Sequence, residues 1–390
     1  MEILISAGEA SGEMYGAQLI DALRRRNPAL TFFGAGGDRM RAAGCEIVVD
    51  ARDLAVVGIT EILTHLPRIY SLYGNLIRAA DEKHPAIAVV IDAPAFNWRV
   101  ARQMRQRKIP VVYYVAPQFW AWRQGRVKLL RKYINLALVI FPFEENFYRV
   151  HGVNAIFVGH PLAELPLPEI SRMHYASQQA LDHMKPWITL MPGSRRKEVR
   201  MNLPAMLDAA ARLGQDYEFL LPVARTLDPG FLKSIIGNRD IHLVPEALPA
   251  LRHSRAGIVA SGTATVEAAL MGTPFVMVYR VSPLTYLLGK PRIKVAHFAM
   301  VNLIAGERIV PELVQGDFTA ANVVAELHKI IPDGEPRTRM LQALAAVKGR
   351  LKKPDRGEHA ADRAAEMILQ MLTPASSPRR EVASAPEHWG

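Results

Sequence analysis

The chain has 390 residues, of which 50% are hydrophobic and 22% are charged, a composition that predicts two or three domains with large cores. Lysine and arginine outnumber aspartate and glutamate by 48 to 37, and the formal net charge of +11 indicates an anionic partner, such as a phosphorylated substrate or an acidic lipid surface. Cys45 is the only cysteine, which excludes an intrachain disulfide and fits a cytoplasmic setting. Because the sequence has no zinc-finger spacing and no RNA-reading aromatic motif, we do not expect nucleic acid as a partner.

Short runs rich in Val and Ile alternate with helical patterns through the first part of the chain. The expected strands are 2–6, 31–33, 46–49, 86–92, 110–115, 136–141 and 155–158, and the helices expected between them include 12–26, 97–107 and 144–151. Apolar strands separated by helices predict a parallel sheet that is covered on both faces.

A stiff stretch, Leu165-Pro166-Leu167-Pro168, then suggests a connection between domains. The alternation restarts at Trp187, and helical patterns dominate 319–372. The predicted fold is α/β, with two Rossmann-like doubly wound domains and a cleft between them. The expected divisions are a first domain at 1–162, a linker at 163–186, a second domain at 187–354, a C-terminal helix at 355–372 and a disordered tail at 373–390.

Residues 256–279 carry a single charge, Glu267, and resemble a transmembrane span by hydropathy alone. Ser, Gly, Thr and Pro interrupt the apolar run, however. We therefore expect a strand, a turn, a helix and a second strand here, and no transmembrane helix.

Two turns in the second half have the composition of phosphate-binding turns. Gly193-Ser194-Arg195 follows the apolar run 188–191, and Ser261-Gly262-Thr263-Ala264 follows 256–260 and opens a helix. Small residues let the backbone approach a ligand, the amides at a helix N-terminus favour anionic oxygens, and Arg195 could add a forked pair of donors. Glu267 lies one helical turn further on, where it could accept sugar hydroxyls. The two turns predict a pocket for a nucleotide diphosphate.

In the first half, Glu9 and Asp92 each follow a predicted strand. Glu9 lies in Gly8-Glu9-Ala10-Ser11-Gly12, whose spacing is not the dinucleotide-binding fingerprint, and the turn could equally be a simple one that Ser11 caps. Asp92 could be a general base or the cap of the following turn. We expect both carboxylates to face one cleft.

Residues 54–77 carry more apolar surface than one core-facing stripe needs, although Pro67 should break or kink the helix. Core packing and an apolar surface that grips lipid both explain this pattern. The candidate lipid contacts are Val56, Ile59, Ile62, Leu63, Leu66, Ile69 and Met201.

Nine short motifs carry a family resemblance. They are Ser6-Ala7-Gly8-Glu9-Ala10-Ser11-Gly12, Leu54-Ala55-Val56-Val57-Gly58, Ile91-Asp92-Ala93-Pro94, Trp120-Ala121-Trp122-Arg123, Phe141-Pro142-Phe143-Glu144, Val158-Gly159-His160-Pro161, Met191-Pro192-Gly193-Ser194-Arg195, Ser261-Gly262-Thr263-Ala264-Thr265-Val266-Glu267 and Asn302-Leu303-Ile304-Ala305-Gly306. In this order they resemble bacterial lipid-A-disaccharide synthase, over about residues 1–372.

The resemblance implies an inverting glycosyltransferase of the two-Rossmann-domain (GT-B) type. Such an enzyme joins UDP-2,3-diacylglucosamine to 2,3-diacylglucosamine 1-phosphate, and it releases UDP and the β-1,6-linked lipid A disaccharide 1-phosphate. The acceptor and its lipid chains would bind the first domain and the UDP-sugar the second. The resemblance also implies a peripheral protein on the cytoplasmic face of the inner membrane, and it is the sole basis for expecting a homodimer. No Asp-x-Asp motif is present, so we expect neither a metal nor another cofactor. The alternative is another UDP-sugar enzyme of this fold, such as a peptidoglycan glycosyltransferase or a UDP-N-acetylglucosamine epimerase.

By resemblance, Asp92 matches the essential base, and Glu9, Arg195 and Asn302 match further functional positions. The UDP pocket matches Ser261, Gly262, Thr263 and Glu267. Three positions depart from the common pattern: Glu13 is one methylene longer than the usual aspartate, Ala95 replaces a candidate second acid, and Glu307 either displaces an arginine contact by one position or removes it.

Overall fold

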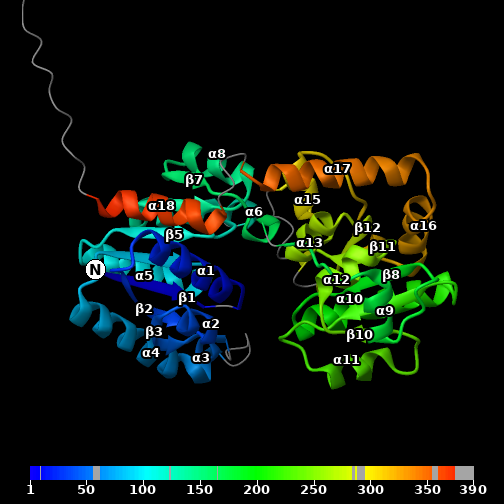
Figure 1. Ribbon diagram of the computed structural model, residues 1–390, viewed down its shortest axis with the longest axis horizontal. Helices are drawn as coiled ribbons and strands as arrows, with labels where there is room; N and C mark the ends of the chain where they lie inside the picture. The colour runs from blue at the N-terminus through cyan, green and yellow to red at the C-terminus, as the bar shows by residue number, and fades with distance from the viewer. Residues whose placement is uncertain are drawn as a thin grey trace, which may run out of the picture.

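The computed structural model describes residues 1–8, 10–55, 62–122, 124–164, 166–282, 286–287, 295–353 and 359–373. Two sheets lie side by side, each flanked by helices (Figure 1). Every strand pairing in both sheets is parallel. The predicted α/β fold with two doubly wound units is therefore confirmed.

The first sheet has the order β3-β2-β1-β4-β5-β6-β7. Its strands are β1 (Glu2–Ala7), β2 (Thr31–Gly36), β3 (Cys45–Asp50), β4 (Ile87–Ile91), β5 (Val111–Tyr114), β6 (Leu136–Val139) and β7 (Ala155–Phe157). The described helices around it are α1 (Ala10–Arg26), α2 (Asp38–Ala42), α3 (Ala51–Ala55), α4 (Ile62–Lys83), α5 (Pro94–Gln106), α6 (Phe119–Trp122), α7 (Val127–Tyr133) and α8 (Pro142–Val150), with 3-10 turns η1 (Gln124–Arg126) and η2 (Pro161–Glu164).

Helix α4 continues through Pro67, so of the two outcomes predicted for this proline, a break and a kink, the break is wrong. A proline inside a helix removes one backbone hydrogen bond, here the bond to the carbonyl of Leu63. In a helix of 22 residues the remaining bonds continue on either side of that gap.

The second sheet has the order β10-β9-β8-β11-β12-β13. Its strands are β8 (Trp187–Met191), β9 (Glu218–Pro222), β10 (His242–Val244), β11 (Ala256–Ala260), β12 (Phe275–Tyr279) and β13 (Glu312–Val314). The accompanying helices are α9 (Arg172–Gln179), α10 (Arg196–Leu213), α11 (Pro229–Ile236), α12 (Ala247–His253), α13 (Thr263–Met271), α15 (Met300–Ala305), α16 (Ala320–Ile330) and α17 (Glu335–Leu351), with the 3-10 turn η4 (Gln315–Asp317).

Two stretches of this half bear on the sequence analysis. The apolar run 256–279 forms β11, α13 and β12, as predicted. Helix α9, inside the expected linker, packs through Tyr175 and Ala176 against Trp187 of the second sheet.

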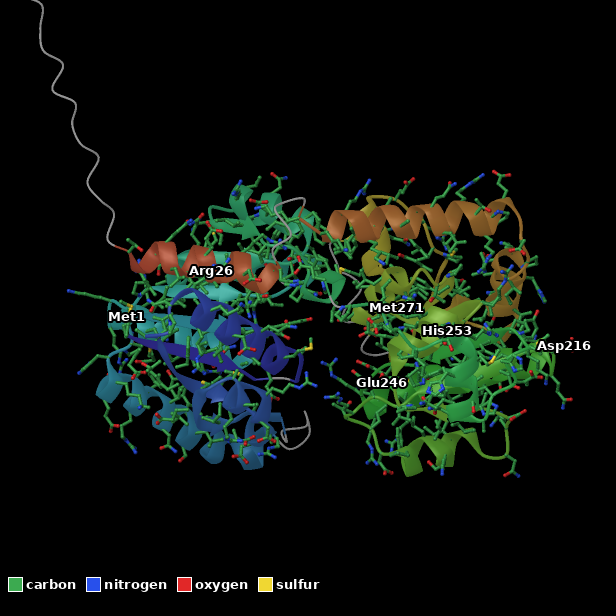
Figure 2. The ribbon with its side chains drawn as sticks, in the orientation of Figure 1. Met1, Arg26, Asp216, Glu246, His253 and Met271 are labelled. Carbon is green, nitrogen blue, oxygen red and sulfur yellow. The ribbon has the colours of Figure 1, made fainter. Side chains whose placement is uncertain are left out.

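The last described helix, α18 (Ala360–Leu372), returns to the first half of the chain and packs against α1 (Figure 1). Asp362 of α18 pairs with Arg25 at 2.9 Å and with Arg26 at 2.7 Å, and Arg26 is labelled where the two helices meet in Figure 2. The buried Arg363 donates from Nε to the carbonyl oxygen of Val158 at 2.6 Å and pairs with Glu164. The chain therefore passes between its two halves twice.

Candidate active site

In each sheet the order in which the strands are added reverses at the centre, and the candidate residues follow the central strands. In the first sheet the order reverses between β1 and β4, and in the second between β8 and β11. Ligands of open α/β sheets bind beyond the carboxyl ends of the strands at such a point. The turn at Gly8 follows β1, Asp92 follows β4, the turn Gly193–Arg195 follows β8, and Ser261 follows β11. The topology thus gathers the predicted residues into two clusters, one at each reversal.

Asp92 has a strained backbone. Its φ is +47° and that of Ala93 is +44°, so two consecutive residues with side chains adopt the left-handed region before α5 begins at Pro94. Such residues cost on the order of 1–3 kcal/mol each, and they persist only where the surroundings hold them.

Asn97 and Tyr113 hold this turn. The fully buried Asn97 donates from Nδ2 to the carbonyl oxygens of Asp92 at 2.8 Å and Ile91 at 2.9 Å, and its Oδ1 accepts from the hydroxyl of Ser6 at 2.7 Å. The Tyr113 hydroxyl donates to the same Asp92 oxygen at 2.7 Å. Sequence reasoning did not assign Asn97. The available signal was an amide side chain on a helix face that is otherwise apolar, with Val100, Ala101 and Met104 buried beside it.

The beginning of α1 lies against Asp92. A Cβ added at Gly12 would lie 3.7 Å from the Cβ of Asp92 and 3.5 Å from the carbonyl oxygen of Ile91. Glu13, one of the departures from the family pattern, accepts from the backbone N–H of Arg39 at 2.7 Å and so caps α2. Its carboxylate thus has a structural task. Glu9 lies outside the described residues.

Tyr15 connects the two clusters. This buried residue of α1 has a raised pKa because of burial and, in addition, because of the negative charges of Asp92 and Glu267. A carboxylate from each half of the chain therefore lies close enough to act on the same phenol. Burial also raises the pKa of Glu267 to about 7, so that near neutral pH its carboxyl group can both donate and accept a hydrogen bond.

At the second reversal, α13 begins with backbone donors that the helix itself does not pair. Its N-cap is Gly262 with φ +131°, which offers no side chain to cap the helix, so the first amides, of Thr263 and Ala264, have no partner within the helix. Ser261 differs from its neighbours because its N–H pairs with Val278 at 3.0 Å and its hydroxyl donates to the carbonyl oxygen of Phe298 at 2.7 Å. Ser261 therefore fixes the turn, and the amides after it form a helix N-terminus, which favours an anion.

The turn after β8 is occupied by a side chain of its own helix. Glu198 accepts from the N–H groups of Ser194 at 3.1 Å and Arg195 at 3.3 Å, and it pairs with the Arg195 guanidinium at 3.1 Å. Gly193, with φ +116°, leaves room for this carboxylate, which would lie 2.5 Å from an added Cβ. A diphosphate at this turn would replace Glu198. The Arg195 side chain is 72% exposed, so the pair that has to separate is weak.

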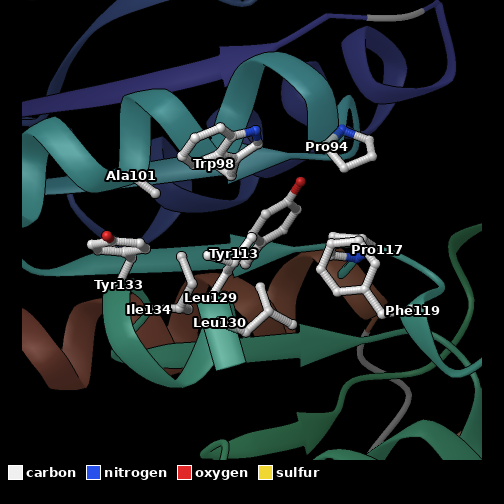
Figure 3. Close-up of a pocket in the computed structure, with 10 residues that line it drawn as sticks. All are labelled: Pro94, Trp98, Ala101, Tyr113, Pro117, Phe119, Leu129, Leu130, Tyr133 and Ile134. Carbon is white, nitrogen blue, oxygen red and sulfur yellow. The ribbon is translucent and has the colours of Figure 1, made fainter. Parts of the chain in front are cut away.

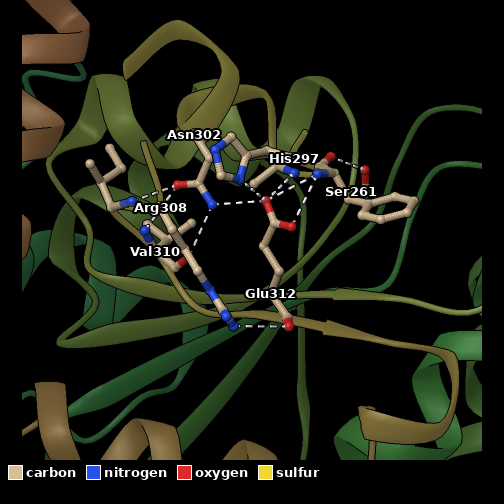
Figure 4. Close-up of polar contacts among 9 residues, drawn as sticks. Ser261, His297, Asn302, Arg308, Val310 and Glu312 are labelled. Atoms are coloured by element: carbon tan, nitrogen blue, oxygen red, sulfur yellow. Dashed lines mark hydrogen bonds and ion pairs between the residues drawn. The ribbon is translucent and has the colours of Figure 1, made fainter. Parts of the chain in front are cut away.

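Asn302 lies in a buried network rather than at the surface (Figure 4). Its Oδ1 accepts from the N–H groups of Ile309 at 2.9 Å and Val310 at 3.0 Å, and its Nδ2 donates to Glu312 at 2.8 Å. These bonds engage both ends of the amide within the protein. The amide of Asn302 therefore joins the segment around Val310 to Glu312.

Glu312 is the centre of that network, and sequence reasoning did not assign it. Besides the bond from Asn302, its carboxylate accepts from the N–H of Phe298 at 3.0 Å and of Ala299 at 2.9 Å (Figure 4). Because the carbonyl oxygen of Phe298 accepts from Ser261, a chain of hydrogen bonds runs from Asn302 to the turn that opens α13. The displaced Arg308 donates to the carbonyl oxygen of Glu312 at 3.2 Å.

The predicted lipid contacts are only partly described. Val56 and Ile59 lie outside the described residues. Helix α4 contains four more of the candidates, but the structure does not describe their side chains: Ile62, Leu63, Leu66 and Ile69. Met201 on α10 is half-buried, and Tyr70 of α4 is 60% exposed.

Comparison with known proteins decides the family. The model of the lipid-A-disaccharide synthetase family matches residues 3–363. A lipid-A-disaccharide synthase of Koribacter versatilis (strain Ellin345) is 53% identical over 376 residues, which cover 95% of this chain and 98% of that protein. The chain belongs to the lipid-A-disaccharide synthetase family. It is accordingly a glycosyltransferase, and this assignment favours the first interpretation of the sequence over another UDP-sugar enzyme.

Solved structures of the same fold are more distant from this family member. A UDP-GlcNAc 2-epimerase from Neisseria meningitidis, bound to UDP-GlcNAc, has a TM-score of 0.63 at 12% identity. The match covers 95% of this chain and 99% of the epimerase chain. The calicheamicin glycosyltransferase has a TM-score of 0.59 at 18% identity, with 96% and 99% covered. Epimerase and transferase share the architecture, so the fold by itself does not distinguish them. Among the helices that the structure describes, none has the length and apolarity needed to cross a bilayer.

Proposed function

We propose that this glycosyltransferase joins UDP-2,3-diacylglucosamine to the 6-hydroxyl of 2,3-diacylglucosamine 1-phosphate, with Asp92 as the base. The observation that carries the assignment of Asp92 is its position. It follows the central strand β4 on a strained turn. Its charge acts on the phenol of Tyr15, on which the charge of Glu267 from the second half also acts. Strained backbone and convergent carboxylates are typical of catalytic sites.

The reaction is a single displacement. The acceptor oxygen forms a bond to the anomeric carbon of the donor while the bond from that carbon to the diphosphate breaks. Asp92 takes the hydroxyl proton, and the electron pair of the broken bond leaves with UDP. Because attack comes from the side opposite UDP, the configuration at the anomeric carbon inverts.

Negative charge develops on the leaving diphosphate, where the amides of Thr263 and Ala264 and the guanidinium of Arg195 would bind it. One well-placed donor of this kind contributes about 3 kcal/mol to the transition state. Arg195 must first leave Glu198, and exposed pairs of this type contribute only about 0–1 kcal/mol. Glu267 would hold the ribose hydroxyls, and the network of Asn302 and Glu312 keeps the Ser261 turn in place.

No step of this reaction requires a metal ion, and we propose that turnover is unchanged in EDTA. Loss of activity in EDTA that Mg²⁺ restores would contradict this.

We further propose that the protein acts at the cytoplasmic face of the inner membrane, where its net positive charge meets anionic lipid and the apolar side of α4 contacts the acyl region. Replacing Ile62, Leu63 and Leu66 by Ser should weaken co-sedimentation with anionic liposomes while the protein stays folded. Unchanged co-sedimentation would refute this membrane contact. The predicted homodimer is tested by light scattering of the purified protein.

The experiment that tests the reaction compares the wild-type protein with Asp92→Asn. Asparagine tolerates the left-handed backbone of this position, so the variant removes the base and keeps the turn. UDP and disaccharide are measured together. Disaccharide from the wild type and none from the folded variant is the expected result. UDP without disaccharide would mean that the acceptor is wrong, and no turnover by the wild type would contradict the function.

A further inference from the structure

A groove lined only by apolar and aromatic residues lies between α5 and α7 (Figure 3). Trp98 borders it from α5, and Leu129, Tyr133 and Ile134 border it from α7 and the residue after it. These four side chains are half-exposed, unlike those of the core beneath them. We call this feature the α5–α7 groove.

The groove ends at the proposed base. Pro94, two residues after Asp92, lines it, as does Tyr113. The hydroxyl of Tyr113 donates to the carbonyl oxygen of Asp92 at 2.7 Å. A molecule in the groove therefore has its inner end next to the residue that would deprotonate the acceptor.

Two cations lie over aromatic residues of the groove. The guanidinium of Arg99 lies 4.9 Å from the ring centroid of Trp98, and the ammonium of Lys132 lies 5.5 Å from that of Tyr133. Both cationic residues are exposed, and the rings hold them at the rim through cation–π attraction. An apolar interior with a cationic rim is complementary to a molecule that has a hydrocarbon chain and an anionic headgroup.

We propose that the α5–α7 groove receives an acyl chain of the phosphorylated acceptor, an inference that rests on the proposed function. The donor also carries acyl chains, but the groove adjoins Asp92 on the first half of the chain, whereas the amides for the diphosphate lie on α13. The groove thus gives the acceptor its own lipid site, separate from the membrane contact proposed for α4.

The groove is narrow. Its empty space, including the open mouth, is about 260 Å³. The chain therefore enters by turning aside the half-exposed rings of Trp98 and Tyr133, motions that are fast for side chains at a surface. Each methylene that leaves water on entry strengthens binding roughly fourfold.

The test varies the acyl length of the acceptor while the donor stays constant. In Leu129→Asn, kcat/KM should fall roughly 15-fold for long-chain acceptors, the loss expected from about two methylenes, and should stay unchanged for a short-chain acceptor. Val150→Asn is the matched control, because Val150 is an aliphatic residue on α8 that is 75% exposed and outside the groove. It should keep the wild-type dependence on chain length.

The possible results separate this inference from the proposed function. If Leu129→Asn binds UDP normally and keeps the wild-type dependence on acceptor length, or changes the dependence on donor length instead, the assignment of the groove is wrong. If the wild type forms no disaccharide from any acceptor, the proposed function itself fails.

A second measurement needs no turnover. An acceptor with a brominated acyl chain should quench part of the tryptophan fluorescence of the wild type, and Trp98→Phe should lose that part although four of the five tryptophans remain. Quenching that is equal in the two proteins would overturn the proposal even if Leu129→Asn failed to fold.

Discussion

The hydrogen bonds of Asn97 predict that Asn97→Ala lowers both the free energy of unfolding and kcat, each for its own physical reason. Asn97→Ala removes the donors to the carbonyl oxygens of Asp92 and Ile91 and the acceptor of the Ser6 hydroxyl, all in a buried position. Asp92 keeps its bond from Tyr113, so about two buried groups lose a partner. At about 1–3 kcal/mol for each such group, the free energy of unfolding should fall by roughly 2–6 kcal/mol.

The same substitution should slow the reaction, because it releases a strained turn. Two left-handed residues store on the order of 1–3 kcal/mol each, and with fewer bonds to hold it the Asp92 backbone relaxes. A displacement of about 1 Å at a reacting group costs on the order of a hundredfold in rate. We therefore expect kcat of Asn97→Ala to fall about a hundredfold under conditions where the protein is fully folded, with the affinity for UDP unchanged.

Thr273→Val is the matched control for Asn97→Ala. It removes one buried hydrogen bond, from the Thr273 hydroxyl to the carbonyl oxygen of Leu251 at 2.6 Å, beyond the far end of α13. Its unfolding free energy should fall by about 1 kcal/mol with kcat unchanged. Urea unfolding and steady-state kinetics measure both quantities. If Asn97→Ala lost stability but kept the wild-type kcat, the argument that Asn97 positions Asp92 would be refuted.

Three further predictions concern the second half. Glu312→Gln keeps the size of the side chain but replaces one acceptor by a donor that faces the N–H groups of Phe298 and Ala299. The affinity for UDP, measured by calorimetry, should therefore fall about tenfold. An unchanged affinity would show that Glu312 does not support the nucleotide site. Glu198→Ala frees the amides and the guanidinium of the Gly193–Arg195 turn. UDP should therefore bind several-fold tighter, although α10 loses its cap. Weaker or equal binding would place the diphosphate elsewhere. Burial disfavours the ionised form of Glu267 and raises its pKa from 4.5 to about 7, so the folded state loses stability as pH rises through this interval. Glu267→Gln should lack that part of the fall, and identical pH profiles of urea unfolding would contradict it.

Local patterns in the sequence were sufficient to predict the strands. Strands of a parallel sheet are buried on both faces, so they form unbroken apolar runs, and 86–92 corresponds to β4 at Ile87–Ile91. The helix after it begins at Pro94 rather than at residue 97, because the left-handed pair Asp92-Ala93 turns the chain earlier than the helical pattern indicates. Proline at the first position of a helix is favoured, and this was the available signal.

The positioning residues of the site could not be predicted in the same way. Asn97 meets Ser6 across 91 positions of sequence, and a single sequence does not reveal that contact. Glu198 is a local partner, three residues after the N-cap, but that N-cap is Arg195 rather than the Ser or Thr of the usual capping box. The return of α18 to the first half depends on Asp362 meeting Arg25 and Arg26, again across long separations.

Tyr15 connects the two halves electrostatically, because carboxylates of both halves act on its phenol. Its hydroxyl is buried, and its pKa is raised by charges that come from opposite halves of the chain. Any change in the separation of the halves alters the distance between Glu267 and the group formed by Tyr15 and Asp92, and electrostatic interactions are strong where water is excluded. The pKa of the Tyr15 phenol therefore depends on how closely α13 approaches α1, and a closer approach of Glu267 raises it further.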